Sequence, residues 1–193
     1  MTIDQLAHIA LFFGHTPAIV TVILVGLFFI NRRVFYMAGC LVLFTLVFNP
    51  ALKVTFQVPL NPALGKVGFA FPSGHMQLST VLYGWIAYKI PNLALRIIVP
   101  IILTGIGFSL IHFGYHNFAD VIVAVFFGAL TIASFQAAEQ KYPKFALPVL
   151  LVVATIALIY SYFSYTILPN EPWISYIVLS GLVAFSCFKK YKL

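Results

Sequence analysis

Long apolar runs separated by short connectors occupy almost the whole chain, and this pattern restricts the possible folds more than any other feature. Hydrophobic residues make up 62 % of the 193 residues, charged residues only 8 %, and the mean hydropathy is +1.04. A soluble domain carries about a quarter charged residues, so lipid is the expected solvent for this surface. Because backbone groups in lipid must pair within the chain, we expect an all-α polytopic membrane helical bundle that forms a single transmembrane domain over residues 1–193.

Seven apolar runs approach the about 20 residues that a helix needs to cross the hydrocarbon core. Two of these runs are short, so the pattern predicts six to seven transmembrane helices. The first run has no basic segment before it and is long, which favours a retained span over a cleaved signal peptide. The predicted spans are 5–30, 34–52, 75–90, 94–112, 117–137, 145–168 and 173–188.

Lysine and arginine residues divide unequally between the two sides of the predicted bundle. Nine of the eleven lie in connectors on one side, and only Lys53 and Lys66 lie on the other. Cytoplasmic connectors are enriched in positive charge, so the connector 53–74 and the junction 109–120 are expected outside. The net charge of +7 does not indicate a nucleic-acid partner, because the basic residues follow the ends of the apolar runs and form no single patch.

The long outer connector ends in Pro72-Ser73-Gly74-His75, directly before an apolar run. Proline favours the first helical turn, and glycine lets a ligand approach the backbone closely. The free N–H groups at a helix start attract an anion. Ser73 adds a hydroxyl donor, and His75 lies where it can protonate a leaving oxygen. The same residues are also compatible with an ordinary helix cap beside an interfacial histidine.

A second polar group, His116 and Asp120, begins the fifth run, and Lys53 ends the second. The i, i+4 spacing places the imidazole and the carboxylate on one helical face. A carboxylate bonded to one ring nitrogen fixes the tautomer and leaves the other nitrogen free to attack, although a purely structural pair would have the same spacing. Lys53 can neutralise a phosphate oxygen or extend to the lipid interface.

His112, His116 and Asp120 also have the spacing of a metal site on one helical face. Gly114 interrupts the continuous helix that such a site needs. We therefore expect no metal and no cofactor, and the metal site stays an alternative.

Taken in order, Lys53, the segment 72–75, Ser109, His116 and Asp120 resemble the three-part motif of the type-2 phosphatidic acid phosphatase superfamily, which includes membrane lipid phosphatases. The Pro-Ser-Gly-His part matches completely, and Ser109, His116 and Asp120 are in register with the third part. The motif-bearing core covers about residues 34–137, and the last two runs lie beyond it.

Two arginines of the family motif are absent from this chain. Their positions are occupied by Leu60 and Leu110. Each charged contact to phosphate that is lost costs roughly two orders of magnitude in rate. Lys66, the other outer base, and His112, one turn before His116 if the helix continues, are candidates to replace these contacts.

The resemblance implies a membrane lipid phosphatase that hydrolyses a phosphomonoester or diphosphate of a lipid at the outer leaflet. It implies that His116 is the nucleophile and forms a phosphohistidine, that Asp120 orients it, and that His75 protonates the leaving group, without a metal. The expected location is a bacterial inner membrane with the site facing the periplasm or exterior. The residues expected to bind the substrate phosphate are Lys53, Ser73, Gly74, Ser109, Lys66 and His112.

The missing arginines also favour a second function, that of a catalytically weak relative that binds anionic lipid or acts as a scaffold. Phosphate transfer between lipids remains open beside hydrolysis. The expected partners are a lipid phosphate substrate and membrane lipids. The apolar helices carry no charged seam that would indicate an oligomeric state.

Overall fold

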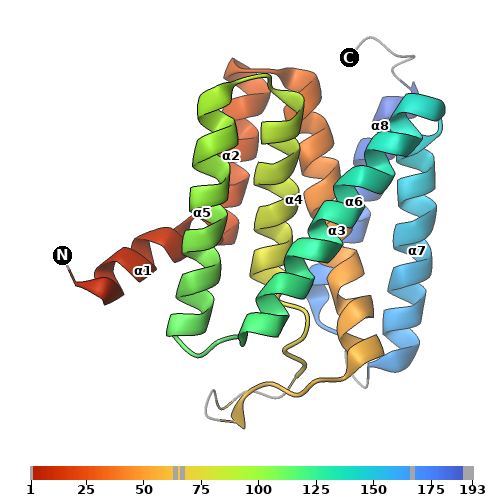
Figure 1. Ribbon diagram of the computed structural model, residues 1–193. Coiled ribbons are helices and arrows are strands. Elements are labelled where there is room, and N and C mark those ends of the chain that lie inside the picture. Colours follow the sequence, from red (N-terminus) through yellow and green to blue (C-terminus); the bar gives the residue numbers. More distant parts are fainter. Residues whose placement is uncertain (1, 63–64, 66–67, 166–167, 189–193) are drawn as a thin grey trace.

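The computed structural model describes residues 2–62, 65, 68–165 and 168–188. Over these residues the chain is an all-α bundle, as predicted, in which eight helices are joined by short connectors (Figure 1). The helices are α1 (Ile3–Phe12), α2 (Thr16–Phe29), α3 (Arg32–Phe56), α4 (Gly74–Lys89), α5 (Leu93–His112), α6 (Phe118–Lys141), α7 (Ala146–Ser164) and α8 (Asn170–Phe188).

Five of the described helices, α3 and α5 to α8, are long and apolar enough to cross a membrane, and α1 with α2 makes a sixth if this bent pair is one span. With only 16 residues, α4 is shorter. It is nevertheless largely buried, because it packs against α3, α5 and α6. Seven helices, α2 to α8, therefore follow one another up and down the bundle (Figure 1), and the predicted polytopic membrane fold is confirmed.

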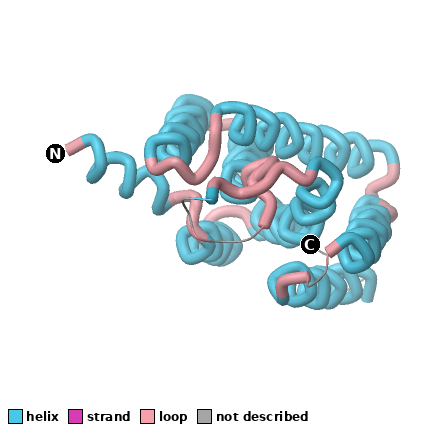
Figure 2. The backbone as a smooth tube through the Cα atoms, turned by 90° about the horizontal axis from the view of Figure 1, so that it is seen from below, coloured by secondary structure: helices cyan, strands magenta, loops and turns pink. Residues whose placement is uncertain are grey.

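The run 5–30 is not the one continuous helix that its hydropathy predicts. It forms two helices bent by 50°, and α1 leaves the bundle sideways (Figures 1 and 2). Pro17 lies in the first turn of α2, where its missing N–H and fixed φ are tolerated, whereas inside a continuous helix it would break a hydrogen bond. His15 has an extended backbone as the N-cap of α2. The break places this histidine at the end of the bundle that carries the motif residues.

A close approach of α4 and α6 sets the relative position of the two motif-bearing helices. A Cβ atom at Gly128 of α6 would lie 2.8 Å from the side chain of Thr80 of α4, which is closer than packed atoms allow. Glycine removes this obstacle, so the helix that starts after Ser73 and the helix that carries Asp120 begin side by side.

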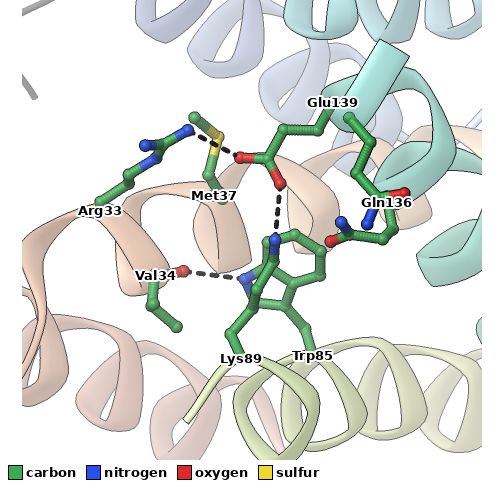
Figure 3. Close-up of a pocket in the computed structure, with 8 residues that line it drawn as sticks. Arg33, Val34, Met37, Trp85, Lys89, Gln136 and Glu139 are labelled. Atoms are coloured by element: carbon green, nitrogen blue, oxygen red, sulfur yellow. Dashed lines mark hydrogen bonds and ion pairs between the residues drawn. The ribbon is translucent and has the colours of Figure 1, made fainter. Parts of the chain in front are cut away.

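The end opposite the histidines is closed by a charged cluster that joins α3, α4 and α6 (Figure 3). Glu139 accepts hydrogen bonds from Lys89 (2.7 Å) and Arg33 (3.1 Å). The Trp85 indole donates to the Val34 carbonyl (3.0 Å), and the Lys89 ammonium lies 4.5 Å from the centre of the Trp85 ring. This arrangement agrees with the predicted concentration of basic residues at one end, whereas Lys53 lies at the other end of α3.

Candidate active site

Ser73 begins α4 and joins the two histidine motifs through the backbone. Its hydroxyl caps the helix by accepting from the Met76 N–H (3.4 Å), and its own N–H donates to the Asp120 carbonyl (3.2 Å). The N–H groups of Gly74 and His75 have no acceptor among the described residues, as expected in the first turn of a helix. The Pro-Ser-Gly-His segment therefore presents two free donors at the positive end of a helix dipole.

Asn49 of α3 holds this segment in place. Its side-chain amide donates to the Gln77 side chain (2.8 Å) and to the Pro72 carbonyl (3.3 Å). A Cβ atom at Gly74 would lie only 3.2 Å from the Asn49 amide oxygen. Glycine at this position thus lets the start of α4 lie directly against α3.

His116 and Asp120 make the predicted contact, with 3.2 Å between His116 Nδ1 and Asp120 Oδ2. His116 precedes α6 and is not part of it, so a shared helical face does not produce this contact. It is produced by a capping box, in which Asn117 N–H donates to Asp120 Oδ2 (3.0 Å) and Asp120 N–H donates to Asn117 Oδ1 (2.8 Å). The carboxylate favours the proton on Nδ1, so Nε2 of the neutral ring carries the free electron pair.

Both members of this pair are removed from solvent, since the Asp120 and His116 side chains are 2 % and 9 % exposed. Burial lowers the pKa of His116, although the hydrogen bond and the charge of Asp120 oppose this change and the charge of Lys53 adds to it. Neutral imidazole is the nucleophilic form. The lowered pKa keeps His116 neutral at pH values somewhat below the ordinary pKa of histidine.

One cavity of about 330 Å³ brings together Lys53 from α3, Gly74 and His75 from α4, and His116 from the connector before α6. The rings of His15 and His75 lie 5.7 Å apart, edge to face. Other described residues that line the cavity are Gly14, Thr16, Ile19, Leu46, Asn49, Pro50, Leu60, Leu78, Tyr165, Pro169, Glu171 and Pro172.

Some predicted phosphate ligands lie elsewhere. The Ser109 hydroxyl donates to the Gly105 carbonyl within α5 (2.7 Å) and does not line the cavity. His112 Nε2 lies 2.7 Å from Asp4 of α1, also outside the cavity. The Ser73 side chain caps α4 and does not line the cavity. Lys66 lies outside the described residues.

The two leucines at the positions of the family arginines have different surroundings. Leu60 lines the cavity, whereas Leu110 is buried in the hydrophobic core. Lys53 is therefore the one lysine or arginine that lines the cavity among the described residues.

The three-residue metal alternative is not supported by the geometry. His112 and His116 pair with different carboxylates. No group of three or more His, Cys, Asp or Glu side chains that could hold a metal ion occurs in the described part of the chain.

The sequence profile of the PAP2 superfamily matches residues 38–144, more than half of the chain. This protein belongs to the type-2 phosphatidic acid phosphatase (PAP2) superfamily. The match covers most of α3, all of α4 and α5, and α6, and so includes Lys53, Gly74, His75 and His116 of the cavity. PAP2 proteins in general hydrolyse phosphate esters. No curated protein and no solved structure matches the chain.

Several cavity residues were missed by sequence reasoning. Asn49 lines the cavity, and Gln77 is bonded to it. Both are polar residues inside apolar runs, a signal that was available but ambiguous. Tyr165 directly follows α7 and Glu171 lies in α8, both beyond the PAP2 match, and no local pattern connects them to the histidines. The fold alone brings them to the cavity.

Proposed function

We propose that this PAP2 protein is a membrane lipid phosphatase that hydrolyses a phosphomonoester or diphosphate of a lipid through a phosphohistidine intermediate. The observation that carries the proposal is that His75, His116 and Lys53 line one cavity beside the free N–H groups of Gly74 and His75. A nucleophile, a proton donor and anion-binding donors are the groups that phosphoryl transfer needs.

In the first step, Nε2 of His116 attacks phosphorus while the bond from phosphorus to the leaving oxygen breaks. His75 gives its proton to that oxygen, so the lipid alcohol, or the lipid monophosphate when the substrate is a diphosphate, leaves in neutralised form. The bound phosphate stabilises the protonated form of His75, because an opposite charge nearby favours the imidazolium. Asp120 stabilises the charge that develops on the His116 ring.

In the second step, water attacks the phosphohistidine. His75, now neutral, accepts a proton from the water, and the phosphorus–nitrogen bond breaks to release inorganic phosphate and free His116. The N–H groups of Gly74 and His75 and the Lys53 ammonium bind the phosphate oxygens in both steps.

We propose that the site faces the periplasm or exterior of a bacterial inner membrane. The supporting observation is that basic residues at helix ends, among them Arg33 and Lys89, lie at the end opposite the histidines. Positive charge beside membrane spans is concentrated on the cytoplasmic side. A site at that membrane interface receives a lipid phosphate from the outer leaflet.

A second candidate function is that of an anionic-lipid-binding or scaffold protein with little activity. Leu60, which lines the cavity where the family motif has an arginine, favours it. Loss of one charge-assisted contact to the transition state costs about 100-fold in rate.

Purified protein in detergent, incubated with phosphatidic acid and with isoprenyl mono- and diphosphates, tests both functions. We expect release of inorganic phosphate that disappears in His116→Ala and His75→Ala. His112→Ala is the matched control, because this histidine lies outside the cavity, and it should retain activity. Binding of these lipids without turnover would support the scaffold function, whereas turnover that survives His116→Ala would refute the proposed mechanism.

A further inference from the structure

An apolar groove of about 360 Å³ runs along the bundle directly beside the cavity. It lies between α2 and α3, with one residue each from α4 and α8. Four residues, Thr16, Ile19, Leu46 and Leu78, line both the groove and the cavity. The two spaces are therefore adjacent, and these four residues form the boundary between them.

We propose that this groove holds one hydrocarbon chain of the lipid whose phosphate lies at His116. This inference rests on the proposed function. It adds the position of the substrate's hydrocarbon chain and the effect of chain length on the rate. A chain attached to a phosphate in the cavity enters the groove past the four shared residues.

The groove has the chemistry that a hydrocarbon chain requires. Thr16 and Tyr36 supply the only side-chain polar atoms among its described lining residues. The Tyr36 hydroxyl donates to the Leu182 carbonyl of α8 (2.6 Å), so its hydrogen is already used. A hydrocarbon chain lying there would meet aliphatic and aromatic surface, and the Tyr36 hydroxyl beside it would stay paired.

The length of the groove matches one leaflet. From Leu46 to Phe35, its two limits on α3, eleven helical residues cover about 16 Å, which is about half of the ~30 Å hydrocarbon core. At about 1.2 Å per bond of an extended chain, this distance corresponds to roughly 13 bonds. The buried Phe35 ring lies against Gly26 of α2 and closes the far end.

A comparable apolar groove of about 310 Å³ lies between α3, α6 and α7. It shares no lining residue with the cavity. A substrate whose phosphate is at His116 therefore reaches the α2–α3 groove and not this second groove.

Gly39 provides a direct way to shorten the α2–α3 groove. It lines the groove seven residues before Leu46, about 10 Å along the helix, or roughly nine bonds from the shared residues. A Cβ atom there would lie 3.7 Å from Ile23, an ordinary contact, so Gly39→Ala fits. The larger side chain of Gly39→Leu would enter the groove.

Monoalkyl phosphates of 6 and 14 carbons test the proposal kinetically, with the ratio of their kcat/KM values as the readout. The ratio is kcat/KM for the 14-carbon substrate divided by kcat/KM for the 6-carbon substrate. We expect Gly39→Leu to lower this ratio about ten-fold, because the new side chain would displace about two methylenes of the longer chain from the groove. Gly181→Leu is the matched control, because Gly181 has nothing within 4 Å of a Cβ atom and lies outside the groove. An unchanged ratio in Gly39→Leu would overturn the proposal.

A second measurement uses the wild-type protein and does not depend on turnover. An alkyl phosphate with a diazirine near its ninth carbon should label α2 and α3 at Ile23, Gly39 and Leu43, and an alkyl alcohol with the same chain should not. Labelling mainly at Phe127 or Val153 of the second groove would overturn the proposal. Equal labelling by the alcohol would show that the groove holds any bilayer chain. Failure of the proposed function appears separately, as labelling of the groove without phosphate release.

Discussion

Replacing Asp120 by asparagine is expected to lower kcat and also to move the pH dependence of the reaction. The Asp120 Oδ2 atom accepts from both His116 Nδ1 and Asn117 N–H, while its other oxygen has no partner among the described residues. An asparagine with its oxygen at the Oδ2 position preserves both hydrogen bonds and places its amide at the unpartnered position. The geometry of His116 is then retained and the negative charge is lost.

The magnitude follows from the strength of that hydrogen bond. A bond to a charged acceptor contributes about 1.5–3 kcal/mol, against about 1 kcal/mol for a neutral one. The loss of about 1–2 kcal/mol of transition-state stabilisation corresponds to a decrease in kcat of about 5- to 30-fold. Asp120→Ala leaves two buried donors without an acceptor, at about 1–3 kcal/mol each, and should lower kcat by more than 100-fold.

The pH dependence separates this electrostatic role from a structural one. Asp120 raises the pKa of His116 through its hydrogen bond and its charge, against the stronger lowering by burial. Removing the charge lowers that pKa further, so neutral His116 persists to lower pH. The acid limb of kcat/KM, already below pH 6.5, should therefore move to still lower pH in Asp120→Asn while the rate falls.

Phosphate release measured from pH 4 to 8 with a water-soluble phosphomonoester tests this expectation. Asn117→Ala is the control, because it removes the capping bond to the Asp120 N–H and keeps the carboxylate. This control should cost about 1 kcal/mol of stability and leave the acid limb in place. An acid limb that stays fixed or moves upward in Asp120→Asn would refute the assignment of Asp120 as the partner of His116.

Four other substitutions give distinct expected outcomes. Lys53→Met should lower kcat/KM about 10- to 100-fold and raise the inhibition constant of inorganic phosphate, with recovery in Lys53→Arg. Glu171→Gln should lower KM for anionic substrates about three- to ten-fold, since it removes a like charge from the cavity, and an unchanged KM would place Glu171 away from the substrate. Gly74→Ala should reduce kcat/KM and cost about 1 kcal/mol of stability, measured by thermal unfolding, because its Cβ crowds Asn49. Glu139→Gln should cost about 1 kcal/mol and leave activity unchanged, since Glu139 lies at the opposite end of the bundle.

The membrane fold could be predicted because its cause is local. A run of about 20 apolar residues has few alternatives to a transmembrane helix, and the boundaries of α5 and α6 lie close to those predicted. The break between α1 and α2 was missed because apolar residues continue through it. Its signal was the Gly14-His15-Thr16-Pro17 segment, which hydropathy alone does not detect.

The candidate site could be predicted only in part. Ser73, Gly74 and His75 are adjacent in sequence, and His116 and Asp120 are four residues apart, so local geometry brings each group together. The position of His112 depends on α1, which bends away by 50° and brings Asp4 to it. Such a contact between distant segments depends on the path of the chain and not on spacing, and for the same reason Asn49 and Glu171 were not found.

The proposed binding of a hydrocarbon chain in the groove beside the cavity bears on the absence of both motif arginines. Leu60 replaces a cation at the cavity wall with an apolar surface, and the groove begins at the neighbouring residues Ile19 and Leu46. Binding energy from a remote, non-reacting part of a substrate can be used to hold the reacting group in position. In the proposed binding mode, contacts with the hydrocarbon chain of the substrate would compensate for the lost contacts with its phosphate. The effects of chain length and of the missing charge on the rate should then be coupled. Restoring the charge with Leu60→Arg should raise kcat/KM for a short-chain phosphate more than for a long-chain one, and an equal increase for both would show that the chain and the phosphate are bound independently.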